Sequence, residues 1–291
     1  MRLCNPLRPA KGFVRLVSHT RYPGMRSTLI ARSFLPFAAR FLYRHPTKLG
    51  RLRQHWADYI GRFGKLAELT GADVARVEAV LYELECEEPL FCEVNGLTGM
   101  PMHPIIYYAL VRLVQPTLVV ETGVCDGFSS RFLLLAMQRN GLGTLHSIDL
   151  PNQDVPLGSE GARQTDILPS GRSTGWLVPA ELRKRWNLHL GDAKDLIPKL
   201  LSELDRIDIF IHDSLHTYEH MLFEFWTAWP HLCDGGILLS DDTDWNGAFA
   251  EFAAKVQCRP VMFNFRVGAI RKPLTLTLSP EGRGMGEGSS L

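Results

Sequence analysis

The sequence predicts an α/β fold with a mostly parallel sheet, a C-terminal antiparallel hairpin and an N-terminal helical extension. Short apolar runs typical of strands alternate with longer segments of helical periodicity, and this alternation builds parallel strands with right-handed crossovers. Near the end of the chain, Val261 to Phe265 and Val267 to Ile270 lie too close together for a crossover helix. These two runs therefore predict a hairpin.

The central element is Leu118 to Ser130, LVVETGVCDGFSS, which predicts a strand, a tight loop and a helix. The apolar run ends at Glu121, and the turn from Gly123 to Gly127 leads into helical periodicity. In an open α/β sheet a ligand binds at the carboxyl end of such a strand. Glycines allow close backbone approach there, and the helix N-terminus offers free N–H groups.

Four further strands are predicted along the chain, at Thr144 to Ile148, Asn187 to Leu190, Ile207 to Ile211 and Ile237 to Ser240. Ahead of the central strand, three helices are predicted from helical spacing: Trp56, Ile60, Phe63 and Leu66; Val74, Val77, Leu81 and Leu84; and Ile105, Tyr108, Leu110 and Val111. The second of these helices has a start signal. Thr70 with Asp73 three residues later resembles a capping box for that helix.

Composition excludes several classes of protein. With 291 residues, of which 45% are hydrophobic, the chain can build one large core. A net charge of +1 gives no global argument for nucleic acid. The six cysteines form no C-x-x-C pair, so neither a zinc site nor a disulfide framework is expected. No apolar run reaches the roughly 18 residues of a membrane span, and we expect a cytoplasmic protein.

The first 57 residues contain no Asp or Glu but many Arg and Lys. Ile30, Phe34, Phe37 and Phe41 fall at helical spacing there, which predicts a basic amphipathic helix. One interpretation is peripheral contact with a membrane surface. The other, which we favour, is a helical cap or the arm of a homo-oligomer, because a helix that buries one face on a neighbour gives the same pattern.

The glycine turn reads Glu-x-Gly-x-x-x-Gly-x-Ser and departs from the G-x-G-x-x-G dinucleotide fingerprint. It resembles the first motif of class I S-adenosylmethionine-dependent methyltransferases, in particular the catechol, macrocin and cephalosporin-type O-methyltransferases. The resemblance covers Asn95 to Lys272 and implies a Rossmann-like sheet. It divides the chain into a basic helical extension (1–94), a methyltransferase domain (95–272) and a tail expected to be disordered (273–291).

The resemblance implies that S-adenosylmethionine is held by Glu121, Gly123, Gly127, Ser129, Asp149, Asp192 and Ala193. Asp149 ends the second strand, where a carboxylate binds a ribose diol in S-adenosylmethionine and NAD enzymes alike. A turn role before Pro151 is the alternative. Asp192 and Ala193 match the family's adenine segment, and helix N-capping by Asp192 is the competing interpretation.

Three carboxylates, Asp213, Asp241 and Asp242, follow the fourth and fifth strands. Clustered anions repel unless a cation compensates them, and oxygen ligands without Cys favour Mg²⁺. A bound metal would lower the pKa of an acceptor hydroxyl. In the resembled catechol enzymes the corresponding acids hold Mg²⁺ with Asn at the third position, from which Asp242 departs. Turn and helix-cap roles are the alternative.

His216 lies three residues after Asp213, at the offset where the resembled catechol enzyme carries its general base. A histidine of near-neutral pKa can take a hydroxyl proton, so His216 and Asp213 are the predicted catalytic residues. Two alternatives stay open. His216 and His220 could form a metal pair, and His216 could be a structural histidine.

The sequence therefore predicts an Mg²⁺-dependent O-methyltransferase that acts on a hydroxyl of a small molecule or sugar. Residues Asn152 to Trp176 form an insertion rich in Pro, Gly, Ser and Thr, which is either an acceptor-binding lid or a mobile loop. The insertion lacks the interleaved aromatic and basic residues of nucleic-acid sites, so a small-molecule or glycan acceptor is expected and nucleic acid is not. An NAD-dependent oxidoreductase and a non-catalytic cofactor-binding scaffold are the alternative functions.

Overall fold

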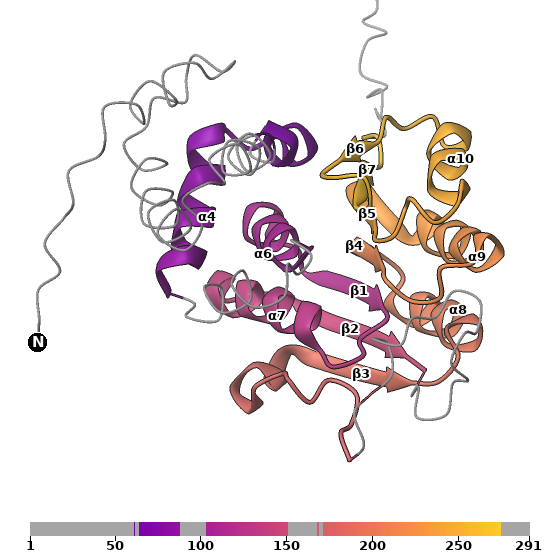
Figure 1. Ribbon diagram of the computed structural model, residues 1–291, viewed down its shortest axis with the longest axis horizontal. Helices are drawn as coiled ribbons and strands as arrows, with labels where there is room; N and C mark the ends of the chain where they lie inside the picture. Colours follow the sequence, from indigo (N-terminus) through magenta and orange to yellow (C-terminus); the bar gives the residue numbers. More distant parts are fainter. Residues whose placement is uncertain (1–60, 62–63, 88–102, 151–167, 169–170, 275–291) are drawn as a thin grey trace, which may run out of the picture.

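The computed structural model describes residues 61, 64–87, 103–150, 168 and 171–274. Seven strands form one sheet in the order β3-β2-β1-β4-β5-β7-β6 (Figure 1). In chain order they are β1 Leu118–Thr122, β2 Thr144–Asp149, β3 Trp186–Leu190, β4 Ile207–His212, β5 Leu232–Ser240, β6 Val261–Met262 and β7 Gly268–Arg271. Strands β1 to β5 pair in parallel, whereas β7 is antiparallel to β5 and β6. The predicted fold is confirmed.

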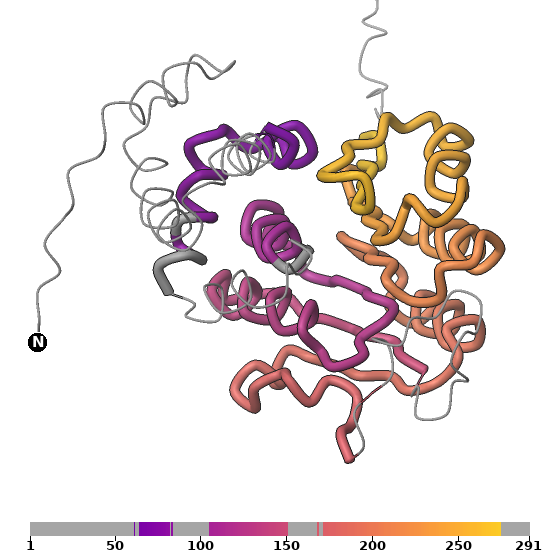
Figure 2. The backbone as a smooth tube through the Cα atoms, viewed as in Figure 1, coloured from indigo at the N-terminus to yellow at the C-terminus, as the bar shows by residue number. Residues whose placement is uncertain are grey.

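Helices cover both faces of the sheet (Figures 1 and 2). They are α4 Val74–Glu87, α6 His103–Val114, α7 Phe128–Asn140, α8 Ala193–Leu204, α9 Tyr218–Ala228 and α10 Ala248–Lys255, with short 3₁₀ turns at Ala180–Arg185 and Trp229–His231. Successive strand residues point to opposite faces. On β1, Val119 packs in the cluster that contains α6 and α7, and Val120 packs in the cluster that contains α8, α9 and α10.

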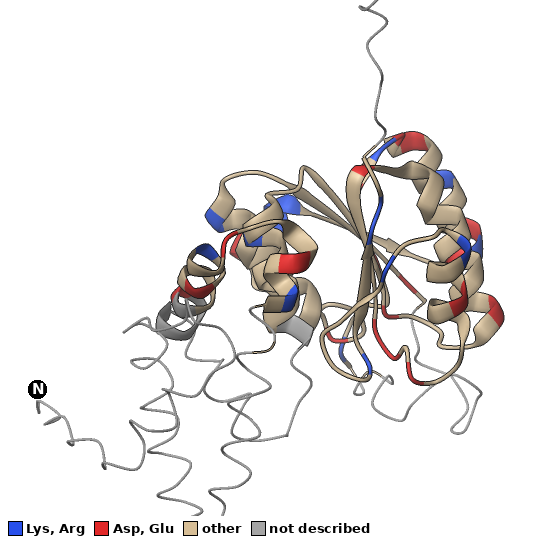
Figure 3. Cartoon of the chain, turned by 90° about the horizontal axis from the view of Figure 1, so that it is seen from above, with Lys and Arg blue, Asp and Glu red and all other residues tan. Residues whose placement is uncertain are grey.

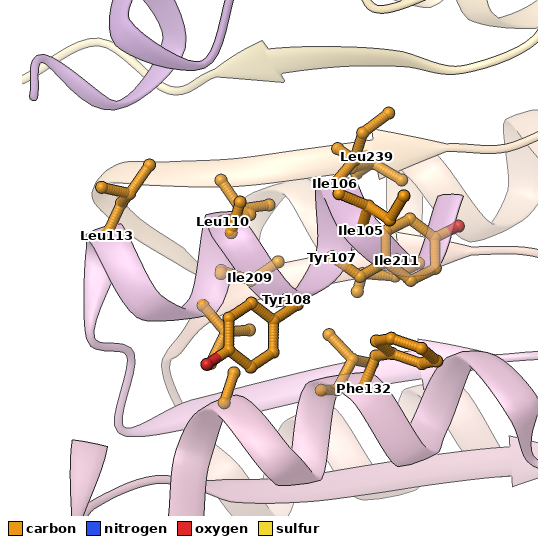
Figure 4. Packing of buried hydrophobic residues seen from close by; sticks show 14 of the residues in the cluster. Ile105, Ile106, Tyr107, Tyr108, Leu110, Leu113, Phe132, Ile209, Ile211 and Leu239 are labelled. Atoms are coloured by element: carbon orange, nitrogen blue, oxygen red, sulfur yellow. The ribbon is translucent and has the colours of Figure 1, made fainter. Parts of the chain in front are cut away.

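Helix α6 forms the centre of the first cluster, packed against β4 and β5 of the sheet and against α7 (Figure 4). Its described side chains from Ile105 to Val111 are almost completely buried, as expected for a helix that is apolar on all sides. The adjacent residues Tyr107 and Tyr108 direct their hydroxyls to opposite ends of this packing (Figure 4). The Tyr108 hydroxyl donates to Glu83 of α4 at 2.6 Å.

Glu83 of α4 forms ion pairs with α6 and with α7. It accepts from Arg112 of α6 at 2.8 Å and from Arg139 of α7 at 2.9 Å. Burial alone would raise the pKa of Glu83, but these hydrogen bonds hold it at about 2. Val77 of α4 belongs to the same apolar cluster as the sheet. Helix α4 lies in the predicted extension, and it shares the core of the sheet.

Several element boundaries differ from the prediction; β6, for example, ends at Met262 and does not reach Phe265. Asp73, and not Thr70, caps α4, because its side chain accepts from the Arg76 N–H at 2.8 Å; the predicted capping box is wrong. Strand β5 begins at Leu232, ahead of the predicted Ile237, and runs through two glycines. The first residue of β5, Leu232, pairs with Ile207 of β4, and the register shifts before the next pair. Local periodicity does not predict such a tertiary contact.

Several predictions lie outside the described residues: the basic helix within residues 1–60, most of the insertion and the tail beyond residue 274. Among the helices that the structure describes, none combines the length and apolarity needed to cross a membrane. Of the described cysteines, Cys233 and Cys258 are free thiols. Helices on both sides of the sheet carry residues of both charge signs (Figure 3).

Candidate active site

The predicted site residues all lie along the carboxyl edge of the parallel strands. Glu121 is on β1, Asp149 ends β2, and Asp213 and Asp241 directly follow β4 and β5. Backbone hydrogen bonds continue past the strand ends. The Asp213 N–H donates to the Thr122 carbonyl and the Asp241 N–H donates to the His212 carbonyl, both at 2.9 Å. The acids are therefore fixed side by side by the sheet itself.

The glycine turn is shaped by contacts within the chain. Gly123 has φ +82°, and a Cβ there would lie 1.8 Å from the Asp213 carbonyl oxygen. Gly127 has φ +86°, and its Cβ would lie 2.7 Å from the Cα of Gly175. Both positions exclude any other residue through backbone conformation and space. The turn consequently packs directly against the end of β4.

Glu121 is buried beneath this turn, with 1% of its surface exposed. Its Oε1 accepts from the Ser147 hydroxyl at 2.6 Å and from the Ser130 hydroxyl. Burial raises the pKa of Glu121 to about 7 despite these donors. Ser129, the predicted residue, lies half-buried in the first turn of α7, while its neighbour Ser130 faces the acid.

The remaining predicted cofactor residues flank the turn. Asp149 Oδ2 accepts from the Cys125 N–H at 3.0 Å and so fastens the turn to β2. Burial raises the pKa of Asp149 to about 6. Asp192 caps α8, because its side chain accepts from the Lys194 N–H at 2.8 Å, as the competing interpretation expected. Ala193 is half-buried at the start of that helix.

The three carboxylates of the acid cluster, Asp213, Asp241 and Asp242, lie against an arginine. Asp241 and Asp242 are 5% and 2% exposed. Arg266 Nε donates to Asp242 Oδ1 at 2.6 Å, its Nη2 donates to the same oxygen, and Nη2 is 3.9 Å from Asp241 Oδ2. Burial and the negative charges of Asp241 and Asp242 raise the pKa of Asp213 well above its ordinary value.

The acid cluster has the oxygen donors that Mg²⁺ prefers, but its arrangement does not fit a bound ion. Asp242 Oδ1 is taken by Arg266, and Asp241 Oδ1 accepts from the Asp242 N–H at 2.7 Å. Within the described ranges, no group of three His, Cys, Asp or Glu residues is placed to hold a metal. Magnesium binding therefore stays a prediction, and the chemistry below uses only the chain's own groups.

His216 is held between two of these acids. Its Nε2 lies 3.8 Å from Asp213 Oδ1 and 3.8 Å from Asp242 Oδ2. On another side its ring packs against Trp245, with centroids 5.3 Å apart. His220 is directed to Glu224 instead, with Nε2 2.9 Å from Oε1, so the arrangement gives no support to a metal pair with His216.

Sequence analysis missed a buried hydrogen-bond network centred on Glu224 of α9. This carboxylate, 0% exposed, has four side-chain partners, on Thr122, His212, Ser214 and His220. Burial would raise the pKa of Glu224, but the charges and hydrogen bonds of His212 and His220 hold it well below its ordinary range. The sequence did contain one signal for this network, because Glu224 stands between Phe223 and Phe225 in an apolar stretch. An acid that is buried with such neighbours almost always has a polar or charged partner.

Tyr107 was missed as well. The side chain is 0% exposed, and burial together with the negative charges of Asp213 and Asp241 raises its pKa well above the ordinary value. Its hydroxyl therefore lies near the acid cluster, reaching it from α6. No local signal separates Tyr107 from its buried neighbours on that helix.

A seven-stranded sheet of this order, with a glycine turn after β1 and acids at its carboxyl edge, has the Rossmann-like methyltransferase architecture. A family model described as a methyltransferase domain matches residues 120–243. The match begins within β1 and ends just past β5, and it agrees with the class predicted from the glycine turn.

Several solved structures are similar to the chain. CalS11, a calicheamicin methyltransferase, is 19% identical with a TM-score of 0.45, over 68% of this chain and 91% of that one. TomG from Streptomyces achromogenes, an O-methyltransferase of tomaymycin synthesis in complex with SAM, is 17% identical with a TM-score of 0.44, over 70% and 91%. A putative O-methyltransferase from Klebsiella pneumoniae is 14% identical with a TM-score of 0.44, over 67% and 96%. No curated protein matches the sequence.

Proposed function

We propose that the chain is an S-adenosylmethionine-dependent O-methyltransferase that methylates a hydroxyl of a small molecule or sugar. One observation carries the proposal. The glycine turn lies in the segment that matches a methyltransferase domain, and its Gly123 packs against the backbone of Asp213. The Asp213 carboxylate in turn faces His216, with Oδ1 3.8 Å from Nε2. A donor at the turn and an acceptor at His216 would therefore be neighbours.

The donor would lie over the half of the edge formed by β1, β2 and β3. Asp149 supports this placement, because a carboxylate at the end of β2 can accept two hydrogen bonds from a ribose diol. Its half-buried position beside the turn gives it that access. The other proposed donor-binding residues are Glu121, Gly123, Gly127, Ser129, Asp192 and Ala193.

His216 would act as the general base. The acceptor oxygen attacks the sulfonium methyl, the S–CH₃ bond breaks, and His216 takes the hydroxyl proton, which leaves a methyl ether and S-adenosylhomocysteine. Asp213 and Asp242, each 3.8 Å from Nε2, stabilise the imidazolium that forms. The sulfonium is an activated donor, so the protein has chiefly to orient the two groups and remove a proton.

The acceptor would enter past exposed apolar residues beside the base. Leu215 is 38% exposed and Trp245 is 37% exposed, and the Trp245 ring packs on His216. An exposed indole offers a flat surface to the ring of a natural product or to the apolar face of a sugar. Mg²⁺ on Asp213, Asp241 and Asp242 stays a prediction from the sequence, and no step of the proposed transfer depends on it.

Calorimetry with S-adenosylhomocysteine tests the donor site. We expect one molecule to bind per chain and Asp149→Ala to weaken binding about tenfold or more, because a charge-assisted pair of hydrogen bonds is lost. A parallel titration with NADH separates the oxidoreductase alternative. Absence of heat with either the donor or its demethylated product would overturn the proposal.

Replacing the base tests the chemistry. His216→Gln should lower kcat about 10²- to 10⁴-fold, the usual contribution of a general base, while binding of S-adenosylhomocysteine is unchanged. His231→Gln is the matched control, because that half-buried side chain bonds only the Asp205 carbonyl among its described contacts. The measurement is turnover across a panel of hydroxylated acceptors. If the His216 variant retains turnover within twofold of the parent, His216 is not the base.

A further inference from the structure

Arg266 is fixed in place by the β6–β7 turn. Its backbone N–H donates to the Asn264 side chain at 2.7 Å. Its carbonyl accepts from both the backbone N–H and the hydroxyl of Thr243 at 2.8 Å. Thr243 directly follows Asp242, so these bonds tie the turn to the end of β5 and bring the guanidinium onto the acid cluster.

The acid that receives the guanidinium is itself constrained. Asp242 has φ +48°, a left-handed conformation that non-glycine residues seldom adopt. Such conformations persist where the surroundings over-determine them, and they concentrate at functional sites. With 2% of its surface exposed, Asp242 cannot rely on water to compensate its charge.

A divalent ion would compete with Arg266 for the same carboxylate. The guanidinium already bonds Asp242 Oδ1 through Nε and Nη2 and lies 3.9 Å from Asp241 Oδ2. An ion that shared these oxygens would lie within a few ångströms of a permanent positive charge, where repulsion between like charges is strong. Arginine is also permanently ionised, so it does not vacate the acid by losing a proton.

We propose that Arg266 is the cation of the acid cluster. It occupies Asp242 in the place where a divalent metal would bind, and by doing so it holds the acids in position around His216 without an added cofactor. Arg266 is thus a positioning residue for the proposed methyl transfer. The charge pairing itself depends on neither the donor nor the acceptor.

Binding of Mn²⁺, followed by electron paramagnetic resonance without donor or acceptor, tests competition. Arg266→Met should bind one Mn²⁺ roughly tenfold or more tightly than the parent chain, because Asp242 is freed as an oxygen ligand. The added site should disappear in Arg266→Met/Asp242→Asn. Arg271→Met is the matched control, since Arg271 belongs to the same hairpin but bonds backbone carbonyls such as that of Gly235.

A thermal-unfolding cycle with Arg266→Met, Asp242→Asn and the double variant tests charge compensation directly. We expect Arg266→Met to lower the melting temperature clearly in the parent chain and far less in the Asp242→Asn background. If Arg266→Met does not fold, Arg266→Lys takes its place in both experiments, because it keeps the charge and loses the guanidinium fork. Coupling between the two sites supports the proposal even if no variant binds Mn²⁺.

Two results would overturn the inference. One is stoichiometric Mn²⁺ binding to the parent chain that Asp213→Asn abolishes and Arg266→Met leaves unchanged. The other is a cycle without coupling between Arg266 and Asp242. Neither result affects calorimetry with S-adenosylhomocysteine, so failure of this inference is distinguishable from failure of the proposed function.

Discussion

Two glutamates, Glu121 and Glu224, are buried under the same edge of the sheet, but their pKa values shift in opposite directions. Glu121, on the half of the edge assigned to the donor, accepts from two serine hydroxyls, and its pKa rises to about 7. Glu224, on the acceptor half, has two hydroxyl partners as well, but it also pairs with His212 and His220 and its pKa falls.

The difference shows what compensates a buried carboxylate. The two serine hydroxyls beside Glu121 offset only part of the pKa rise that burial causes. The two histidines beside Glu224 outweigh that rise, so its pKa lies below the ordinary value. The β1–β2 half therefore tends to hold its acid protonated near neutral pH. On the β4–β5 half, His212 and His220 lower the pKa of Glu224, and Arg266 pairs with Asp242.

Glu224→Gln should destabilise the fold by about 3 to 5 kcal/mol at pH 7, because it leaves buried histidines without their charged partner. Denaturant unfolding measures the loss. Glu219→Gln, an exposed residue of the same helix, should change stability by less than about 0.5 kcal/mol. Equal effects of the two variants would show that the network around Glu224 contributes little.

The sign of the pH dependence for Glu224 follows from its lowered pKa. The stabilisation is present above the ordinary value of 4.5 and is lost as pH falls toward the folded-state pKa. The gap between the parent chain and Glu224→Gln should therefore narrow in acid. A gap that widens below pH 4.5 would contradict this assignment.

Glu121→Gln should behave in the opposite way. A raised pKa contributes stability that is complete below 4.5 and is lost as pH rises through about 7. The variant should match the parent chain near pH 4 and exceed its stability at pH 8 by up to about 3 kcal/mol, because only the parent has to ionise a buried acid whose pKa is about 7. Melting temperatures across this range provide the measurement, and a variant less stable than the parent at pH 8 would refute the assignment.

Asp192 gives the smallest effect and separates two roles. Asp192→Ala should cost about 1 kcal/mol through loss of the cap on α8, whereas Asp192→Asn keeps a capping oxygen and should cost far less. Affinity for S-adenosylhomocysteine is the second readout. If Asp192→Asn retains both stability and affinity, Asp192 acts only as a helix cap.

Elements with strong local patterns were predictable. The strand before Glu121 and the acids after β5 follow from apolar runs that end in polar residues, because the carboxyl ends of parallel strands meet at one edge. The metal prediction rested on the same local logic, that clustered acids need a cation. In the structure the cation beside Asp242 is Arg266, which lies 24 residues later in the β6–β7 hairpin. The sequence does not show which basic side chain contacts the acids.

Pairings within helices were equally hidden. Ser129 and Ser130 are indistinguishable by composition, and a rotation of about 100° per helical residue decides which of them faces Glu121. Glu224 depends on partners from β1, β4 and the loop that follows β4. Such contacts are set by the packing of distant elements, so local periodicity does not specify them.

The contact at Gly123 links the two halves of the edge mechanically. No methyl group fits between this residue and the peptide of Asp213. The backbone of the glycine turn and the backbone at the end of β4 are therefore closely packed at this point. A displacement of the turn toward β4 would therefore press directly on the peptide of Asp213.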